Sequence, residues 1–441
     1  MSATHLYVYG AFVHGAKAFL IGTSARRAAR CVLGSLFVMD DQRAISYFGT
    51  TNGRVPHKTF GIRQADRLFH LYAIGRTGAG KSTLMETLML QDIRAGRGCA
   101  LIDPHGDLAA RLVARVPPSR RPDLIYWNVP NPDQPYGYNP LRRVRKDKIP
   151  LAASGLLEAL KKLWSDSWGV RMEHLLRNAL YALLEYGDAT LPDVLRMFTD
   201  ETFRREVLTK VENPQVYAFW TSEYPKQSPA FQKDAIAPIQ NKIGAFLADP
   251  RLHRILTAPK VDLSLRRIMD DGKVLIINLA KGELGEDSAN LLGALIVSTI
   301  SVAAFSRVAI PEAKRRPFFL YIDEFQNFTT LAVASMVSEL RKYKVGLTLA
   351  HQHLHQLPDD VRHAVLANVG TLIAFRLGPE DANIIARELH PVFEPADLVH
   401  LPSHNIALKL MIDGAPTRPF SGTSLAPVAL PNSEESEERH P

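Results

Sequence analysis

The first residues whose types and spacing could do chemistry form a glycine-rich segment with the pattern G-x-x-x-x-G-K-[ST]. It reads Gly75-Arg76-Thr77-Gly78-Ala79-Gly80-Lys81-Ser82 and is followed by Thr83. The glycines let the backbone wrap around phosphate groups with its N–H groups pointing inward. Lys81 would reach the β- and γ-phosphates, and the Ser82 hydroxyl would bind Mg²⁺. Because an apolar run precedes the segment and a helical run follows it, the pattern predicts a nucleoside triphosphate site at residues 75–83 rather than a chance turn.

A pair of acidic residues, Asp323 and Glu324, ends a second apolar run that begins at Phe318. Carboxylates at the end of a buried strand need a cation or a water to offset their desolvation. Asp323 would hold the hydration shell of Mg²⁺, and Glu324 would polarise the attacking water as a general base. Such a pair is common by itself. Together with the phosphate loop it indicates nucleotide hydrolysis rather than a passive nucleotide switch.

Two further polar clusters follow apolar runs, at residues 103–107 and at His351-Gln352. Gln352 would sense the γ-phosphate; the alternative is an ordinary loop glutamine. All of these clusters fall at the carboxyl ends of expected strands, and open α/β sheets bind their ligands at that edge. The clustering therefore supports a single site.

Three other features have an ordinary interpretation that spacing alone favours. Arg341 is near the end of a helical segment, where a positive charge complements the helix dipole; the alternative is an arginine finger that reaches a neighbouring subunit. The histidines between His351 and His355 lack the Cys or carboxylate spacing of a zinc site. The basic stretch from Arg111 to Lys148 is expected to be solvated surface, with phosphate contacts to a nucleic acid as the alternative.

The elements that must position these groups are short apolar runs separated by helical segments. The expected strands cover residues 71–74, 100–103, 124–128, 274–279, 318–323, 346–350, 371–375 and 406–412. Runs of this length that are rich in β-branched and aromatic residues are typical of buried strands. Alternation of strands and helices predicts an α/β fold with a mostly parallel sheet and helices on both of its faces.

A block of about a hundred residues in the middle of the chain follows the helical period only. In one segment of it, apolar residues from Met172 to Leu184 recur at i, i+3, i+4 and i+7, which predicts an all-α domain inserted between strands. The predicted organisation is an N-terminal cap or vestigial anchor, a motor domain in two parts around the helical insertion, and a disordered acidic tail. The cap or anchor covers residues 1–50, and the two parts of the motor domain cover residues 51–148 and 263–425. The helical insertion covers residues 149–262, and the tail covers residues 426–441.

The composition bounds the classes of function. With 441 residues, of which 46% are hydrophobic and 22% charged, the chain is neither disordered nor fibrous. Its net charge of +8 permits a polyanionic partner, and its two cysteines exclude a disulfide scaffold and indicate a reducing compartment. The most apolar N-terminal stretch, residues 6–22, contains His14 and Lys17, so no convincing membrane span is expected and a degenerate anchor is the alternative.

The ordered set of motifs resembles the HerA/FtsK superfamily of hexameric DNA-pumping ATPases. Within it, the chain most resembles the type IV secretion coupling proteins, which are TraG/TraD-like DNA translocases of conjugation. The resemblance covers about residues 60–425, and the matching segments are 60–62, 70–82, 103–107, 138–141, 323–328, 341–343, 352, 375–378 and 413–414. The first two membrane-spanning helices that are usual in coupling proteins are not clear in this sequence.

This resemblance implies a RecA-like P-loop motor with ATP and Mg²⁺ bound between the subunits of a homo-oligomeric ring, a hexamer, and with DNA in its pore. It implies a trans arginine finger at Arg341 and a glutamine sensor at Gln352. The expected catalytic residues are thus Lys81, Glu324, Gln352 and Arg341, and Ser82 and Asp323 are the expected Mg²⁺ residues. DNA would bind without sequence preference. Relaxosome or secretion-channel proteins are the expected partners, and the expected location is cytoplasmic, with peripheral attachment to the inner face of a bacterial membrane as a variant.

The function expected from the sequence is therefore an ATP-driven DNA translocase of conjugation or type IV secretion. Three alternatives stay open: a HerA-like translocase or helicase in repair or defence, a protein-secretion ATPase, and a nucleotide-dependent scaffold for DNA-processing partners. Glu324 and Arg341 weigh against the scaffold, because a scaffold needs neither.

Overall fold

The computed structural model describes residues 43–53, 57–164, 168–257 and 260–427. Residues 428–441 of the predicted acidic tail and residues 1–42 of the predicted N-terminal cap lie outside these residues. The last part of the range predicted as a cap is described, and it forms the strand β1 (Ile45–Thr51). Because β1 pairs with two strands of the main sheet, residues 45–50 belong to that sheet and not to a separate cap.

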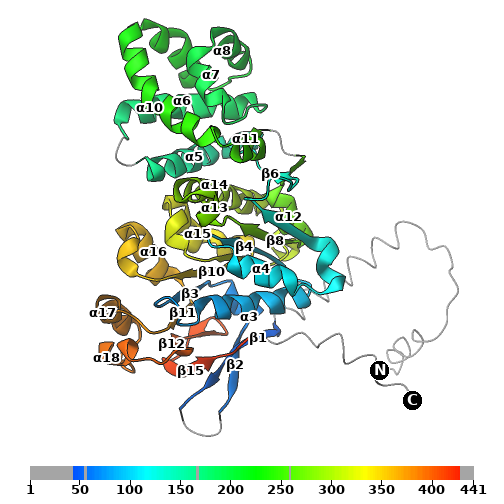
Figure 1. The fold of residues 1–441 in the computed structure, drawn as a ribbon, viewed down its shortest axis with the longest axis vertical. Coiled ribbons are helices and arrows are strands. Elements are labelled where there is room, and N and C mark those ends of the chain that lie inside the picture. Colours follow the sequence, from blue (N-terminus) through cyan, green and yellow to red (C-terminus); the bar gives the residue numbers. More distant parts are fainter. Residues whose placement is uncertain (1–42, 54–56, 165–167, 258–259, 428–441) are drawn as a thin grey trace, which may run out of the picture. The chain divides into compact units, whose positions relative to one another are not determined.

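The central element is an eleven-stranded sheet with the order β2-β1-β15-β12-β11-β3-β10-β9-β4-β8-β5 (Figure 1). All neighbours from β11 to β5 are parallel. These strands are β11 (Thr371–Ala374), β3 (Leu71–Ile74), β10 (Val345–His351), β9 (Phe318–Ile322), β4 (Gly98–Asp103), β8 (Val274–Asn278) and β5 (Leu124–Asn128). The predicted mostly parallel sheet is thus confirmed, and each of these strands overlaps a predicted one.

Four antiparallel strands extend the sheet beyond β11: β12 (Asn405–Lys409), β15 (Phe420–Ser424), β1 and β2 (Thr59–Arg63). The sequence did not predict β1, β2 or β15, since their residues are largely polar or glycine and are only partly buried. The single strand predicted at residues 406–412 is confirmed for residues 406–409 only. The chain leaves β12 at Leu410, and β13 (Met411–Ile412) forms a separate hairpin with β14 (Ala415–Pro416).

Helices cover both faces of the sheet (Figure 1). Along β9, Leu320 and Ile322 join the apolar cluster that contains α14 (Glu286–Phe305), whereas Phe319 and Tyr321 join the cluster that contains α3 (Lys81–Arg94). Successive side chains of a strand point to opposite faces, so this alternation places one apolar core on each face. The other helices of the motor part are α2 (Gln64–Arg67), α4 (Asp107–Ala114), α12 (Leu265–Asp271), α13 (Lys281–Leu284), α15 (Leu331–Glu339), α16 (Asp359–Asn368), α17 (Pro379–Glu388) and α18 (Pro395–Val399).

Between the two-residue strands β6 (Tyr136–Gly137) and β7 (Val261–Asp262), which pair in parallel, the described chain is helical. Its α-helices are α5 (Ile149–Leu163), α6 (Val170–Tyr186), α7 (Asp193–Thr199), α8 (Glu201–Leu208), α9 (Pro214–Ala218), α10 (Pro229–Leu247) and α11 (Pro250–Thr257). The apolar residues from Met172 to Leu184 that carried the helical period are buried along α6. This helical block matches the predicted all-α insertion; its limits at residues 149 and 262 stay a prediction.

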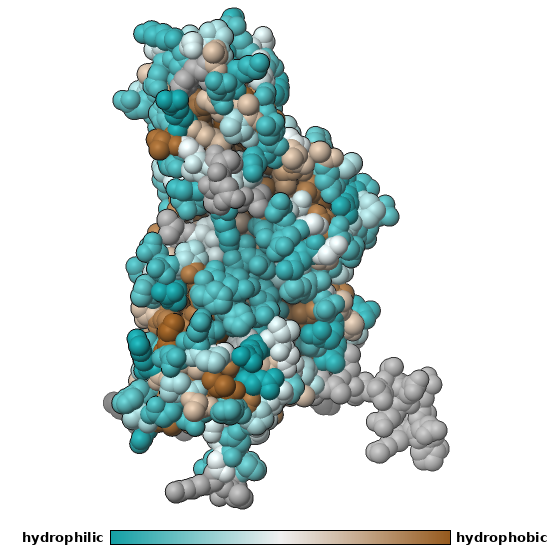
Figure 2. Space-filling view, turned by 60° about the vertical axis from the view of Figure 1, so that its left-hand side comes forward, coloured by the Kyte–Doolittle hydropathy of each residue, from teal (hydrophilic) through white to brown (hydrophobic). Residues whose placement is uncertain are grey.

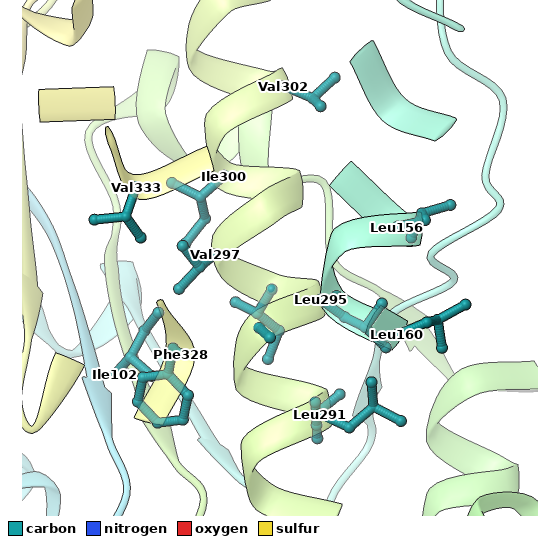
Figure 3. Packing of buried hydrophobic residues seen from close by; sticks show 14 of the residues in the cluster. Ile102, Leu156, Leu160, Leu291, Leu295, Val297, Ile300, Val302, Phe328 and Val333 are labelled. Carbon is teal, nitrogen blue, oxygen red and sulfur yellow. The ribbon is translucent and has the colours of Figure 1, made fainter. Parts of the chain in front are cut away.

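The helix α14 joins the block to the motor. Within the described residues one helix, Glu286–Ala309, is long and apolar enough to cross a membrane, but 83% of its most apolar window is buried inside the fold. Figure 3 shows that Leu291 and Leu295 approach Leu156 and Leu160 of α5, while Val297 points toward Ile102 and Phe328. Its apolar length is therefore used for packing between the block and the sheet.

The outer surface contrasts with this interior. Figure 2 shows a face on which hydrophilic residues predominate and apolar ones gather only in small patches. Most exposed large apolar side chains of the described residues, such as Val170, Val308 and Ile412, belong to separate elements, and Ile45 and Tyr47 share β1. Scattered exposure of this kind is usual for a protein surface and marks no apolar docking face.

Candidate active site

The carboxyl ends of β3, β10, β9 and β4 meet at one edge of the sheet. Ile74 pairs with His351, Leu349 with Ile322, and Ile322 with Ile102, each in parallel. The glycine-rich loop, Gln352, the acidic pair and the cluster at residues 103–107 follow these strands directly. The structure therefore brings all of the predicted polar clusters to the same edge.

The glycine-rich loop turns tightly between β3 and α3. Gly78 and Gly80 have φ angles of 73° and 123°, which side chains other than glycine rarely adopt. The Lys81 ammonium donates to the carbonyls of Gly75 at 2.6 Å and Arg76 at 3.3 Å. Burial lowers the pKa of Lys81, although Glu324 and Asp323 act against the shift. A buried cation at the start of a helix, inside a curled backbone, is the arrangement that binds a polyphosphate.

Two segments that the sequence analysis did not single out as site residues hold this loop in place. The amide of Arg76 donates to the carbonyl of Arg376 at 2.9 Å, and the amide of His404 donates to the carbonyl of Ala79 at 3.0 Å. A Cβ at Gly80 would lie 2.9 Å from the Phe375 ring and 3.0 Å from His404 Nδ1. Glycine at position 80 is thus required both by its φ angle and by these close neighbours.

Ser82 and Asp323 meet beside the loop. The Ser82 hydroxyl donates to Asp323 Oδ2 at 3.2 Å, and the amide of Glu324 donates to Asp323 Oδ1 at 3.0 Å. Burial, followed by the charges of Glu324 and Asp103, raises the pKa of Asp323 to about 6. A hydroxyl and a carboxylate are the hard oxygen donors that Mg²⁺ prefers, and this ion often takes its remaining ligands from phosphates and water. The residues present therefore fit a Mg²⁺ ion that arrives with a nucleotide.

Glu324 is the centre of a chain of hydrogen bonds across three loops. Gln352 Nε2 donates to Glu324 Oε1 at 2.7 Å, and the Thr77 hydroxyl donates to Gln352 Oε1 at 2.8 Å. Gln326 Nε2 donates to Glu324 Oε2 at 2.8 Å. Glu324 itself is buried and has a left-handed φ of 45°. The sequence analysis named Gln352 but gave no role to Gln326, whose only signal was its place in the segment 323–328.

Asp103, in the fourth cluster, has a local structural task. Its two carboxylate oxygens accept from the amides of His105 and Ala109, both at 2.9 Å. It therefore holds the turn that starts α4, and its charge acts on the site by raising the pKa of Asp323.

Arg341 does not lie with Lys81, Glu324 and Gln352. It belongs to the 3₁₀ turn η9 (Leu340–Tyr343), which comes directly before β10. The seven residues of β10 then lead to His351, at the edge of the sheet where the polar clusters meet. At about 3.3 Å per residue, the strand separates Arg341 from this edge by roughly 20 Å. Because of this distance, Arg341 cannot contact a nucleotide that is held by the loop of its own chain. Its side chain is exposed.

The histidine considered as a metal ligand, His351, and the basic side chains between Arg111 and Lys148 have ordinary partners within the fold. His351 is buried against Tyr72 and Phe325, and burial lowers its pKa to about 3. No group of three or more metal-ligating side chains is found among the described residues. In the basic stretch most side chains pair with a carboxylate, namely Arg111, Arg115, Arg120, Arg142, Arg145, Lys146 and Lys148. His351 is thus a buried strand residue rather than a polar loop histidine, and carboxylate pairs account for most of the basic stretch.

Comparison with known proteins gives one family. The model of the type IV secretion-system coupling protein DNA-binding domain matches residues 60–389. No curated protein sequence matches the chain. Among solved structures, the unbound bacterial conjugative coupling protein TrwBdeltaN70 is 18% identical, with 90% of this chain and 93% of that chain covered and a TM-score of 0.61.

Two further structures have the same fold. The plasmid coupling protein TrwB in complex with ADP and Mg²⁺ is 19% identical over 84% of this chain and 88% of that chain, with a TM-score of 0.60. VirB4 of Thermoanaerobacter pseudethanolicus is 15% identical over 86% of this chain and 96% of that chain, with a TM-score of 0.59. These likenesses confirm the predicted fold, a P-loop α/β motor with an all-helical domain.

Proposed function

This chain belongs to the family of the type IV secretion-system coupling protein DNA-binding domain, and from this premise we propose that it is an Mg²⁺-dependent ATPase that translocates DNA. The observation that carries the proposal is the bridge made by Gln352, which hydrogen-bonds Thr77 of the phosphate loop and Glu324 at once. A side chain in this position links the occupancy of the loop to the orientation of the acidic residue. Such a link suits a protein that hydrolyses what the loop binds.

In this proposal residues 75–83 bind the phosphates of ATP, and Lys81 exchanges its bonds to the Gly75 and Arg76 carbonyls for bonds to the β- and γ-phosphates. Ser82 and Asp323 hold Mg²⁺, which supplies neutralisation of phosphate charge. The proposal is supported by the donor set of these two side chains and by the coupling protein TrwB, whose structure contains ADP and Mg²⁺.

Glu324 is the proposed general base. It is buried, and two glutamine amides, those of Gln352 and Gln326, donate to its two carboxylate oxygens. Amide donors stabilise the charged carboxylate and fix its direction, which a base must have to accept a proton from the attacking water. When a γ-phosphate contacts Thr77 or Gln352, the same bonds would shift and release Glu324 toward that water.

Arg341 is proposed to complete the site of a neighbouring copy. Its position at the opposite end of β10 excludes a role at its own loop, and its exposure leaves the guanidinium accessible to a partner. An arginine supplied in trans stabilises the transition state of phosphoryl transfer. This arrangement would make hydrolysis depend on a ring, here proposed as a hexamer with sequence-independent DNA in its pore and with relaxosome or secretion-channel proteins as partners.

The proposal is tested by the ATPase rate of the purified full chain with Mg²⁺, with and without single- and double-stranded DNA, beside Lys81→Ala and Glu324→Gln. We expect DNA to stimulate turnover several-fold and both variants to abolish it. Wild-type turnover that ignores both kinds of DNA would refute the DNA motor and would favour a protein-secretion ATPase. Turnover unchanged by Glu324→Gln would refute hydrolysis at this site.

A further inference from the structure

Lys162 reaches from the helical block to the loop that contains Glu324. It lies in the last turn of α5 and donates to the carbonyl of Gln326 at 2.6 Å and to the hydroxyl of Thr329 at 3.0 Å. Gln326 belongs to the 3₁₀ turn η8 (Phe325–Phe328), which begins directly after Glu324. The ammonium of Lys162, in the helical block, is thus hydrogen-bonded to the main chain two residues after the proposed general base.

These contacts are continuous with the hydrogen bonds of the site. The Thr329 hydroxyl also donates to the Gln326 carbonyl at 3.0 Å, so Lys162 and Thr329 share this acceptor. The side chain of Gln326 then donates to Glu324 Oε2 at 2.8 Å. A displacement of Lys162 would therefore move the backbone of Gln326 and, with it, one of the two amides that orient Glu324.

The ammonium of Lys162 occupies this place at a cost. Burial lowers its pKa to about 7, which shows that its surroundings disfavour the charged form. The adjacent Lys161 is exposed, and its ammonium lies 3.6 Å from a carboxylate oxygen of Glu173 on α6. The two lysines follow each other on one helix, yet only Lys162 points to the Glu324 loop. This difference indicates a directed contact rather than a solvated helix end.

The helix that carries Lys162 is fixed to the motor at a second place. Leu156 and Leu160 of α5 pack beside Leu291 and Leu295 of α14, as Figure 3 shows. A shift of α5 along α14 would therefore be passed on to Gln326 through a short hydrogen bond rather than be absorbed by a loop.

We propose that Lys162 is a positioning residue through which the helical block controls the orientation of Glu324. Lys162 holds the turn η8 closed, and this keeps Gln326 against Glu324. A ligand or partner that moves the helical block would then change the rate of hydrolysis without touching the nucleotide. The inference rests on the proposed function, since it assigns Glu324 as the base.

The experiment compares Lys162→Met, which keeps the length of the side chain without its charge, with Lys161→Met as the matched control in the full chain. We expect Lys162→Met to lower kcat roughly tenfold and to leave KM for ATP and the affinity for fluorescent ADP within about twofold. Lys162→Arg, which keeps a charged donor, should recover most of the turnover. Parallel losses of ADP affinity, melting temperature and turnover would overturn the proposal, because they would indicate a merely structural contact.

A second readout does not depend on turnover. Amide hydrogen exchange of residues 323–329 should become faster in Lys162→Met and stay unchanged in Lys161→Met. Unchanged exchange in Lys162→Met overturns the proposal whatever the ATPase rate, whereas a wild type without turnover refutes only the proposed function. If Lys162→Met does not fold, Thr329→Val removes the other partner of the Gln326 carbonyl and should raise exchange in the same segment; no change there also overturns the proposal.

Discussion

The guanidinium of Arg341 lies 3.5 Å from the centre of the Phe69 ring, a cation–π contact between two segments far apart in the sequence. Phe69 lies two residues before β3, and β3 ends at the phosphate loop. The contact with Arg341 therefore lies just before the amino end of β3, and the proposed nucleotide site lies at the carboxyl end of the same strand. In the proposed ring, the two ends of β3 would lie at two different ATP sites, one at each interface of the subunit.

Substitution of Phe69 tests whether this contact prepares Arg341 for a neighbouring site. Phe69→Leu removes the ring but keeps an apolar side chain. We expect it to lower kcat roughly fivefold, because a cation–π contact of this kind contributes about 1 kcal/mol. Phe69→Tyr, which keeps a ring face, is the matched control and should retain activity. Equal losses in both variants would point to packing alone.

Mixing of inactive variants tests whether Arg341 acts in trans. Lys81→Ala and Arg341→Ala should each be inactive. Mixed rings contain some interfaces with an intact loop from one subunit and an intact arginine from the next, so the mixture should regain a measurable ATPase rate. A mixture that stays inactive after subunit exchange, which is verified by light scattering or native mass spectrometry, would contradict the trans role.

Gln352 offers a test of the sensor role. Gln352→Ala removes one donor to Glu324 and the acceptor of Thr77, so we expect kcat to fall by roughly ten- to a hundredfold. The affinity for ADP should stay nearly unchanged, since ADP lacks the γ-phosphate. Gln356→Ala, at an exposed position of the same loop, serves as the control. A large loss of ADP affinity in Gln352→Ala would mean that Gln352 supports the loop rather than senses its occupant.

Much of the site was predictable because its signals are local. The phosphate loop is contiguous in sequence, and the acidic pair and Gln352 directly follow strands whose apolar residues are buried on both faces. Parallel pairing then places every such strand end at one edge. The fold class and the convergence of these clusters follow from that pattern alone.

The remaining parts depend on contacts that no local pattern encodes. The strands β1, β2 and β15, at the antiparallel end of the sheet, contain several polar and glycine residues, and they are fixed by pairing with neighbouring strands. Phe375 and His404 support the phosphate loop from strand ends far along the chain. The contact of Lys162 with Gln326 spans 164 residues and joins a helix to a turn, so only the folded structure reveals it.

His70 should make stability sensitive to acid. Its ring nitrogen Nδ1 accepts from the amide of Leu347 at 3.1 Å, and burial, with help from the charge of Arg341, lowers its pKa from 6.5 to about 4. The unfolded chain binds a proton at this histidine below pH 6.5, and the folded chain does so only near pH 4. The contribution of His70 to the free energy of unfolding is therefore complete above pH 6.5. It is lost as the pH falls toward 4, and this loss is on the order of 3 kcal/mol.

The measurement is the urea midpoint of the nucleotide-free protein between pH 8 and pH 4.5, for the wild type and for His70→Asn. Asparagine tolerates the left-handed φ of 69° at this position. The variant should be less stable at pH 8, and the difference between the two proteins should shrink as the pH falls. Parallel curves over the whole range would show that His70 does not titrate in the unfolding transition.

Gly293 of α14 links the stability of the core to the turn η8, which follows the proposed base Glu324. A Cβ at this position would lie 2.3 Å from the ring of Phe328, which is fully buried and ends the turn η8 after Glu324. Because a buried ring has little room to move, Gly293→Ala should destabilise the protein by about 1–3 kcal/mol, against the usual gain from alanine in a helix. It should also lower kcat, since the displaced ring belongs to the turn that positions Gln326.

The matched control is Gly244→Ala in α10, where an added Cβ has no neighbour within 4 Å. This substitution should stabilise the protein by about 0.5–1 kcal/mol through helix propensity and leave turnover unchanged. Urea unfolding and ATPase rates of both variants provide the comparison. If Gly293→Ala were as stable as the control and fully active, the close approach of α14 to Phe328 would not constrain the active site.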